Sequence, residues 1–228
     1  MGKIDVVPVA AKAKVSGKRR ARFSRAGSAR RLLEGFGHGD LLSGLTYGQF
    51  SLIDLIQATL EVTGPADVAI STWSAGFYDV DAAETFRDFG LMRSVRFVLD
   101  SSQQKRGQAS AFDVAEIFGR ENVRTTRSHA KFVTVSNEGW SVLITSSMNL
   151  NLNQRVEQFQ IVDDVDSMGV FAGFVDELFR SEEFSVEQRA MPVLLGLPGE
   201  SALGIDALPW REIERGEPPM IGCSIEQG

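Results

Sequence analysis

The sequence predicts an α/β protein, and three observations support this class. Short runs of apolar and β-branched residues alternate with amphipathic helical segments between residues 51 and 126, a pattern typical of parallel strands joined by helices. A β-hairpin pattern follows at residues 129–145. The chain has 228 residues, 43% of them hydrophobic, which is enough for one sizeable core.

Residues 51–126 contain signals for where the expected helices begin and end. Ser51 and Asp54 resemble a capping box that opens a helix over residues 51–63. Glycines follow the last residue of the expected helices and end them. The expected order after the first helix is a strand at 68–72, a helix at 81–89, a strand at 95–99, a helix at 109–118 and a strand at 122–126. The helix at 109–118 is expected to bury Phe112, Ala115, Ile117 and Phe118.

The second half predicts a hairpin, one more strand and a last helix. The polar run 136–139 reads as the hairpin turn, with Gly139 suited to a positive φ, and a return strand covers 140–145. An apolar run at 159–162 predicts the next strand. The last helix spans 168–180, and its apolar stripe predicts packing alone: Phe171, Phe174, Val175, Leu178 and Phe179.

Chemistry-bearing side chains gather around this hairpin. His129 and Lys131 lie two positions apart, so on a strand they emerge from the same face. The return strand brings Ser147 and Asn149 beside them, and Glu157 opens the next strand. One imidazole, one fixed positive charge and neutral donors suit a tetrahedral phosphate. A histidine can attack phosphorus or protonate the leaving oxygen, and Glu157 could fix its tautomer.

The run His129-x-Lys131 followed by Ser146-Ser147-x-Asn149 resembles the phospholipase D superfamily, whose motif is HxK, four residues, D, then GSxN. The resemblance covers roughly residues 50–180 and is greatest to members with one motif per chain. Two positions depart from the motif, because its aspartate falls at Ser136 and its glycine at Ser146. The resemblance implies a mixed sheet flanked by helices.

The resemblance also implies an activity, a phosphodiesterase that cleaves nucleic acid without a metal or another cofactor. Two HxK motifs must meet in one centre, so a homodimer is expected. One His129 would form a phosphohistidine and the other would act as acid and base. Lys131, Ser147 and Asn149 would bind the phosphate, and the catalytic set would be His129, Lys131, Asn149 and Glu157.

The charge distribution favours a nucleic-acid partner. Residues 1–31 hold ten Lys or Arg and one acid, whereas the whole chain carries a net charge of −6. We expect a disordered basic arm at 1–31, a phospholipase D-like domain at 32–180 and an irregular tail at 181–228. The arm could equally be a solvated tail. Further nucleic-acid contacts are expected from Arg127, Lys105, Arg106, Lys18, Arg19 and Arg20.

Several other classes find no support in the sequence. No apolar run approaches the length of a membrane span, so we expect no membrane partner and a cytoplasmic location. Two distant histidines and one cysteine give no metal-site spacing. The glycines around His38 do not form a dinucleotide-binding loop. Trp73 is interpreted as core packing in preference to a rim residue.

Two alternatives to catalysis stay open at this stage. The absent motif aspartate is compatible with a catalytically degenerate protein that binds nucleic acid through the phosphate pocket and the basic arm. A protein-interaction module acting through its acidic surface and tails is the third hypothesis. Phospholipid stays open as a substrate in place of nucleic acid.

Overall fold

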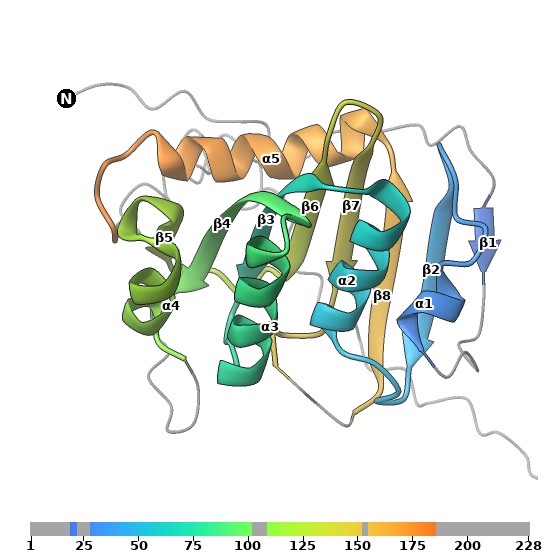
Figure 1. Ribbon diagram of the computed structural model, residues 1–228, viewed down its shortest axis with the longest axis horizontal. Coiled ribbons are helices and arrows are strands. Elements are labelled where there is room, and N and C mark those ends of the chain that lie inside the picture. Colours follow the sequence, from blue (N-terminus) through green and yellow to red (C-terminus); the bar gives the residue numbers. More distant parts are fainter. Residues whose placement is uncertain (1–18, 22–27, 102–108, 152–154, 186–228) are drawn as a thin grey trace, which may run out of the picture. The chain divides into compact units, whose positions relative to one another are not determined.

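The protein folds around one mixed sheet of eight strands in the order β1-β2-β8-β7-β6-β3-β4-β5 (Figure 1). The computed structural model describes residues 19–21, 28–101, 109–151 and 155–185. The strands are β1 (Arg19–Ala21), β2 (Leu41–Thr46), β3 (Ala66–Thr72), β4 (Met92–Asp100), β5 (Val123–Thr126), β6 (Phe132–Ser136), β7 (Ser141–Ser146) and β8 (Glu157–Asp163). The helices are α1 (Ala29–Leu32), α2 (Leu52–Thr63), α3 (Phe77–Asp88), α4 (Ala111–Phe118) and α5 (Val165–Phe179), with a 3-10 turn at Arg120–Asn122.

The sheet has a parallel part and an antiparallel part. β3, β4 and β5 are parallel to one another, and β6 lies antiparallel beside β3. β6, β7 and β8 form an antiparallel meander, and β2 pairs antiparallel with β8. The predicted α/β class, with a mixed sheet and flanking helices, is therefore confirmed.

Each face of the sheet has its own apolar core. The larger core lies between the sheet and α1–α4, and includes the fully buried Phe97, Ile70 and Leu55. Figure 1 shows α2, α3 and α4 in front of the strands, while α5 crosses them. The predicted stripe of α5 packs on the other face, against Phe132, Leu143 and Val162. No helix among the described residues is long and apolar enough to cross a bilayer.

The local signals for the start of α2 and for the ends of α2 and α4 are accurate, whereas α3 begins at Phe77 and α5 at Val165, earlier than the expected starts at 81 and 168. Ser51 caps α2 and forms the expected capping box with Asp54. A second capping box, Ser110 with Asp113, starts α4. Gly64 and Gly119 follow α2 and α4 with φ of 75° and 91°, a conformation that costs glycine little.

Phe112 and Gly139 differ from the expectation. The side chain of Phe112 is 60% exposed because Val114, Ala115 and Phe118 take the inward face of α4, and Phe112 lies about 200° around the helix from Val114. Gly139 does not adopt a positive φ. The amide oxygen of Asn137 holds the hairpin turn instead, accepting from the backbone N–H groups of Gly139 and Trp140, each at 3.0 Å.

The N-terminal side of the sheet contains strands that the sequence does not predict. β2 lies in a glycine-rich stretch without a strand-like pattern, and its pairing with β8 defines it. β1 lies in the predicted basic arm and pairs parallel with β2 through residues 19–21. The rest of the arm before residue 28, and the tail after residue 185, lie outside the described residues. The proposed domain boundaries stay predictions.

Candidate functional site

The carboxyl ends of β3, β4, β5 and β7 and the starts of β6 and β8 meet at one edge of the sheet, the lower edge in Figure 1. We call this the site edge. His129 and Lys131 lie between β5 and β6, Ser147 and Asn149 follow β7, and Glu157 starts β8. The topology thus brings these five predicted residues to the same edge, although they span 29 positions in the chain. β6 and β7 are direct neighbours, as are β7 and β8.

His129 and Lys131 lie just before β6, outside the strand to which the alternating pattern assigned them. Neighbouring side chains hold this segment in place. The Asp100 carboxylate accepts from the backbone N–H of Ser128 at 2.9 Å, and the Ser71 hydroxyl donates to the carbonyl of Ala130 at 3.1 Å. The backbone N–H of Ser146 donates to the carbonyl of Lys131 at 3.2 Å. This last bond brings the segment next to the end of β7.

The two side chains converge as the HxK spacing predicts. The ammonium of Lys131 donates to the backbone carbonyl of His129 at 2.7 Å and lies 3.2 Å from Nδ1 of its ring. An ammonium can only donate, so this contact assigns the lone pair to Nδ1 and the proton to Nε2. In this neutral tautomer Nε2 carries the proton and can donate a hydrogen bond. A phosphate that attracts Lys131 away would release Nδ1.

Trp73 contacts the imidazole directly. It follows β3 at the site edge, and its ring centroid lies 5.5 Å from that of His129 at an interplanar angle of 56°. Trp73 is half-buried, whereas His129 is exposed. The indole therefore forms one wall beside the ring and restricts its orientation. The interpretation of Trp73 as core packing alone missed this contact.

The electrostatics around Lys131 combine two opposing effects. Partial burial lowers the pKa of Lys131 below its ordinary value, while the negative charges of Glu157 and Asp100 raise it. Burial is the larger effect, because an ammonium removed from water loses hydration. The cation is thus held near two carboxylates but incompletely solvated. An anionic ligand would restore favourable interactions to this charge.

Ser147 and Glu157 join β7 to β8 at the site edge. The Ser147 hydroxyl donates to the Glu157 carboxylate, and it accepts from the backbone N–H of Gln158 at 3.0 Å. Glu157 was expected to hold the His129 tautomer. In the structure its carboxylate accepts from Ser147 and acts on Lys131 through its charge. The role of Glu157 in catalysis stays a prediction.

Asn149 carries an unusual buried acceptor. Within the part of the chain that the structure describes, no donor reaches its buried amide oxygen. The next residue is firmly held, because the N–H of Leu150 donates to the Thr72 hydroxyl at 3.0 Å and its carbonyl accepts from Gly76 at 2.6 Å. A buried polar atom left without a partner is costly. The Asn149 amide therefore lies in a fixed loop with capacity for a further hydrogen bond.

The expected nucleic-acid contacts are only partly described. Arg127 is exposed at the site edge. Arg19 and Arg20 form part of β1, and their side chains are not described. Lys18, Lys105 and Arg106 lie outside the described residues, so their part in binding stays a prediction. The described ranges also contain no cluster of three or more His, Cys, Asp or Glu that could hold a metal ion.

Ser136, where the motif has its aspartate, lies at the far end of β6 from Lys131. Five residues along a strand correspond to about 16 Å. Ser136 pairs with Asp67 and Ser141, at the start of β3 and β7. The absence of a carboxylate at position 136 therefore does not remove one from the site edge.

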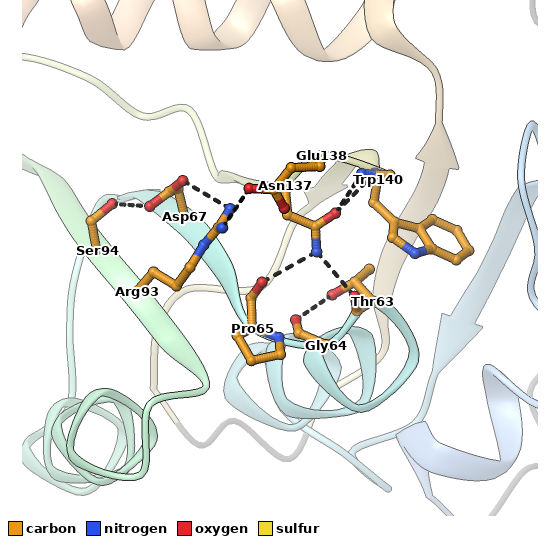
Figure 2. A network of polar contacts seen from close by, with 10 residues as sticks. Thr63, Gly64, Pro65, Asp67, Arg93, Ser94, Asn137, Glu138 and Trp140 are labelled. Atoms are coloured by element: carbon orange, nitrogen blue, oxygen red, sulfur yellow. Dashed lines mark hydrogen bonds and ion pairs between the residues drawn. The ribbon is translucent and has the colours of Figure 1, made fainter.

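A polar network surrounds that far end (Figure 2). Arg93 donates to Glu138 at 2.8 Å and to Asp67 at 3.3 Å. Beside it, the Asn137 amide donates to the carbonyls of Thr63 and Pro65 at 3.0 and 3.2 Å. These hydrogen bonds tie the hairpin turn to the α2–β3 connection. Glu138, a candidate substitute for the motif aspartate, belongs to this network and not to the site edge.

Replacing Asn137 with alanine is expected to lower the free energy of unfolding by about 2 kcal/mol, because four hydrogen bonds of the turn are lost. The matched change is Glu138→Ala, which removes one exposed ion pair and should change the free energy of unfolding much less. Urea denaturation of the two variants measures the difference. Equal losses would contradict the role assigned to Asn137.

Asp100 is a second site-edge residue whose role sequence reasoning missed. It contacts the backbone just before His129 and acts on the charge of Lys131. Its position directly after an apolar strand was the available signal, because ligands in such sheets lie beyond the carboxyl ends of parallel strands.

Comparison with known proteins gives fold-level similarity. No family model matches the sequence, and no curated protein matches it. Among solved structures, Nuc, a phospholipase D family member from Salmonella typhimurium, has 15% identity and a TM-score of 0.44, covering 61% of this chain and 93% of that one. NucT from Helicobacter pylori has 12% identity and a TM-score of 0.42, covering 62% and 97%. Polyphosphate kinase from Porphyromonas gingivalis has 12% identity and a TM-score of 0.44, covering 62% and 26%. At these identities the likeness concerns the fold alone and assigns no role to any residue.

Proposed function

We propose that this chain is a phospholipase D-like phosphodiesterase that hydrolyses nucleic-acid phosphodiesters. The observation that carries the proposal is the convergence of His129 and Lys131 with Ser147 and Asn149 at one sheet edge. These residue types occupy the HxK and SSxN positions of the motif. Together they provide a nitrogen nucleophile, a cation and directional donors, which is the set that phosphoryl transfer requires.

Lys131 and the neutral donors would bind the phosphate oxygens. The incompletely solvated Lys131 ammonium gains an anionic partner when a phosphodiester enters. The Nδ2 group of Asn149, and the Ser147 hydroxyl after it turns away from Glu157, would donate to the same group. As Lys131 turns toward the phosphate it leaves Nδ1 of His129, so the imidazole can rebind its proton there and expose a lone pair on Nε2.

The proposed reaction needs two copies of the chain. In the first step Nε2 of one His129 forms a bond to phosphorus while the bond to the leaving oxygen breaks. The partner's His129 gives that oxygen a proton. In the second step the same imidazole takes a proton from water, the water oxygen attacks phosphorus, and the phosphorus–nitrogen bond breaks. The protonation states of both histidines are then restored, and no metal or cofactor takes part.

The nucleic-acid substrate rests on charge. The basic stretch at residues 1–31 can neutralise a phosphate backbone, and exposed Arg127 lies at the site edge. We also propose a homodimer, because the chain carries one HxK motif and the reaction needs two. We propose a cytoplasmic location for it. A second candidate is a binding protein without catalysis, which Ser136 favours. Against it, position 136 lies about 16 Å along β6 from Lys131.

Hydrolysis in EDTA tests the proposal. The wild-type protein is incubated with bis(p-nitrophenyl) phosphate and with single- and double-stranded DNA and RNA. We expect turnover that persists in EDTA and whose rate per chain falls on dilution, as dimers dissociate. Turnover by a species that sedimentation shows to be monomeric would contradict the two-histidine mechanism. Binding without turnover of any substrate would favour the second candidate.

A further inference from the structure

Exposed apolar side chains concentrate at the site edge. Among the described residues, seven large hydrophobic side chains are exposed. Two of them, Phe89 and Val165, lie at the opposite edge, after α3 and at the start of α5. The other five lie at the site edge and form what we call the aromatic rim: Tyr47, Phe77, Tyr78, Phe112 and Val156. Four of these five are aromatic, so the rim offers flat rings in particular.

Backbone contacts connect the rim to the site from two sides. Tyr47 and Val156 adjoin Thr46 and Glu157, which pair across β2 and β8. Phe77 and Tyr78 follow Gly76, whose backbone N–H donates to the carbonyl of Leu150, the residue after Asn149. Tyr78 is 75% exposed and Tyr47 59%. Both rings are thus available to a ligand that occupies the site.

The two halves of the rim stand on either side of His129 and Lys131. β8, β7 and β6 separate β2 from β3 in the sheet, a distance of about 19 Å at about 4.8 Å per strand. Lys131 precedes β6, between these limits. A phosphodiester bound at Lys131 would therefore have aromatic rings on both sides.

Exposed cations lie at this edge beside two carboxylates that already have hydrogen-bond partners. Arg127 and Arg155 are exposed there, in addition to Lys131. The Glu157 carboxylate accepts from Ser147 and that of Asp100 from a backbone N–H. Rings interleaved with cations are the usual composition of a surface for unpaired nucleic acid, because bases stack on the rings and phosphates meet the cations.

We propose that the aromatic rim binds single-stranded nucleic acid by stacking unpaired bases on Tyr47 and Tyr78, on the two sides of the scissile phosphodiester. The inference rests on the proposed function and specifies its substrate as an unpaired strand. Bases within a duplex have their faces covered by neighbouring bases, so the rings could not stack on them without unpairing. Stacking tolerates any base, hence no sequence preference is expected from the rim.

The test uses a fluorescein-labelled single-stranded oligodeoxynucleotide, the matching duplex and an abasic strand of equal length. Binding is measured by fluorescence anisotropy with full-length Tyr47→Ala, Tyr78→Ala and the double variant. We expect about tenfold weaker single-strand binding for each replacement and about 100-fold for both, the effect of one stacked base per ring. The abasic strand should bind all these proteins with equal affinity. Binding of a single-stranded RNA of equal length shows whether the protein also distinguishes ribose from deoxyribose, since its bases can stack in the same way.

Phe89→Ala is the matched control, since Phe89 is 79% exposed beside the other end of α3. It should bind as the wild type does. Wild-type affinity in the double variant, or an equal loss for duplex and abasic strand, would overturn the proposal. The proposal would also fail if the variants changed only the oligomeric state seen by sedimentation. The rim would then be a contact between copies of the chain.

The same variants separate this inference from the proposed function. Bis(p-nitrophenyl) phosphate is too small to reach both halves of the rim, so its hydrolysis should be unchanged by Tyr47→Ala and Tyr78→Ala. Rim variants that cut single strands as fast as wild type would defeat the rim and leave the phosphodiesterase standing. If wild type hydrolyses no diester, the proposed function fails, and single-strand binding still decides the rim.

Discussion

Replacing His129 with alanine is expected to reduce diester hydrolysis by about 10³-fold or more. In the proposed mechanism the change removes the nucleophile from one chain and the proton donor from its partner, and each such role is worth about 10²–10⁴-fold. His129 is exposed, so the variant should fold normally. Initial rates on bis(p-nitrophenyl) phosphate, together with circular dichroism, measure both expectations.

His38→Ala is the matched control because His38 is the other histidine of the chain. Its Nδ1 lies 3.2 Å from the Asp163 carboxylate, and its ring lies 4.0 Å from that of Trp140, at the opposite edge of the sheet. We expect wild-type rates from this variant. Equal activity in His129→Ala and wild type would refute the proposed nucleophile.

Replacing Lys131 with methionine is expected to reduce turnover by about 10²–10³-fold, the usual effect of removing one charge-stabilising group from a transition state. Methionine keeps most of the length of the side chain, so the change tests charge in particular. Lys131→Arg is the informative comparison. A planar guanidinium cannot reproduce both contacts with His129, and only partial activity should return.

Lys131→Met is expected to increase the stability of the fold, although it lowers turnover. Burial lowers the pKa of Lys131 in the folded state, so the unfolded chain holds this proton more tightly. Stability contributed at this residue therefore rises with pH from the lowered folded pKa up to the ordinary value. At neutral pH the charge opposes folding, and Lys131→Met should unfold at a higher urea concentration than wild type. A lower midpoint would contradict this assignment.

Activity should follow the same titration. The proposed phosphate contact requires the ammonium form, and that form is lost at lower pH than for an exposed lysine because its pKa is lowered. The alkaline limb of the rate profile is thus expected below the ordinary lysine range. In the rates of Lys131→Met this limb should be absent.

Local sequence signals predicted most elements because those elements have local causes. The capping box at Ser51 and the glycines that follow α2 and α4, Gly64 and Gly119, all act within one turn of a helix. The HxK and SSxN spacing correctly grouped residues whose strands are direct neighbours. Such features depend on few distant contacts, and a pattern of residues therefore suffices to find them.

The errors arise where tertiary contacts decide. β2 has no strand pattern of its own, and β8, far along the chain, supplies its partner groups. The turn at Gly139 follows from the side chain of Asn137, not from the glycine. Asp100 and Trp73 contact the segment of His129 only because the ends of β3 and β4 and the start of β6 lie at a common edge. The spacing of residues along the sequence does not reveal these tertiary contacts.

The pairing of β2 with β8 has a consequence for how the chain acquires its structure. Leu41 pairs with Val162, so β2 must wait for almost the whole domain to leave the ribosome. Closing so long a loop costs conformational entropy before the contacts between β2 and β8 can stabilise the pairing. The β3–α3–β4 unit, whose strands lie close in sequence, can form first. We expect nascent β2 to stay open to chaperones until β8 emerges.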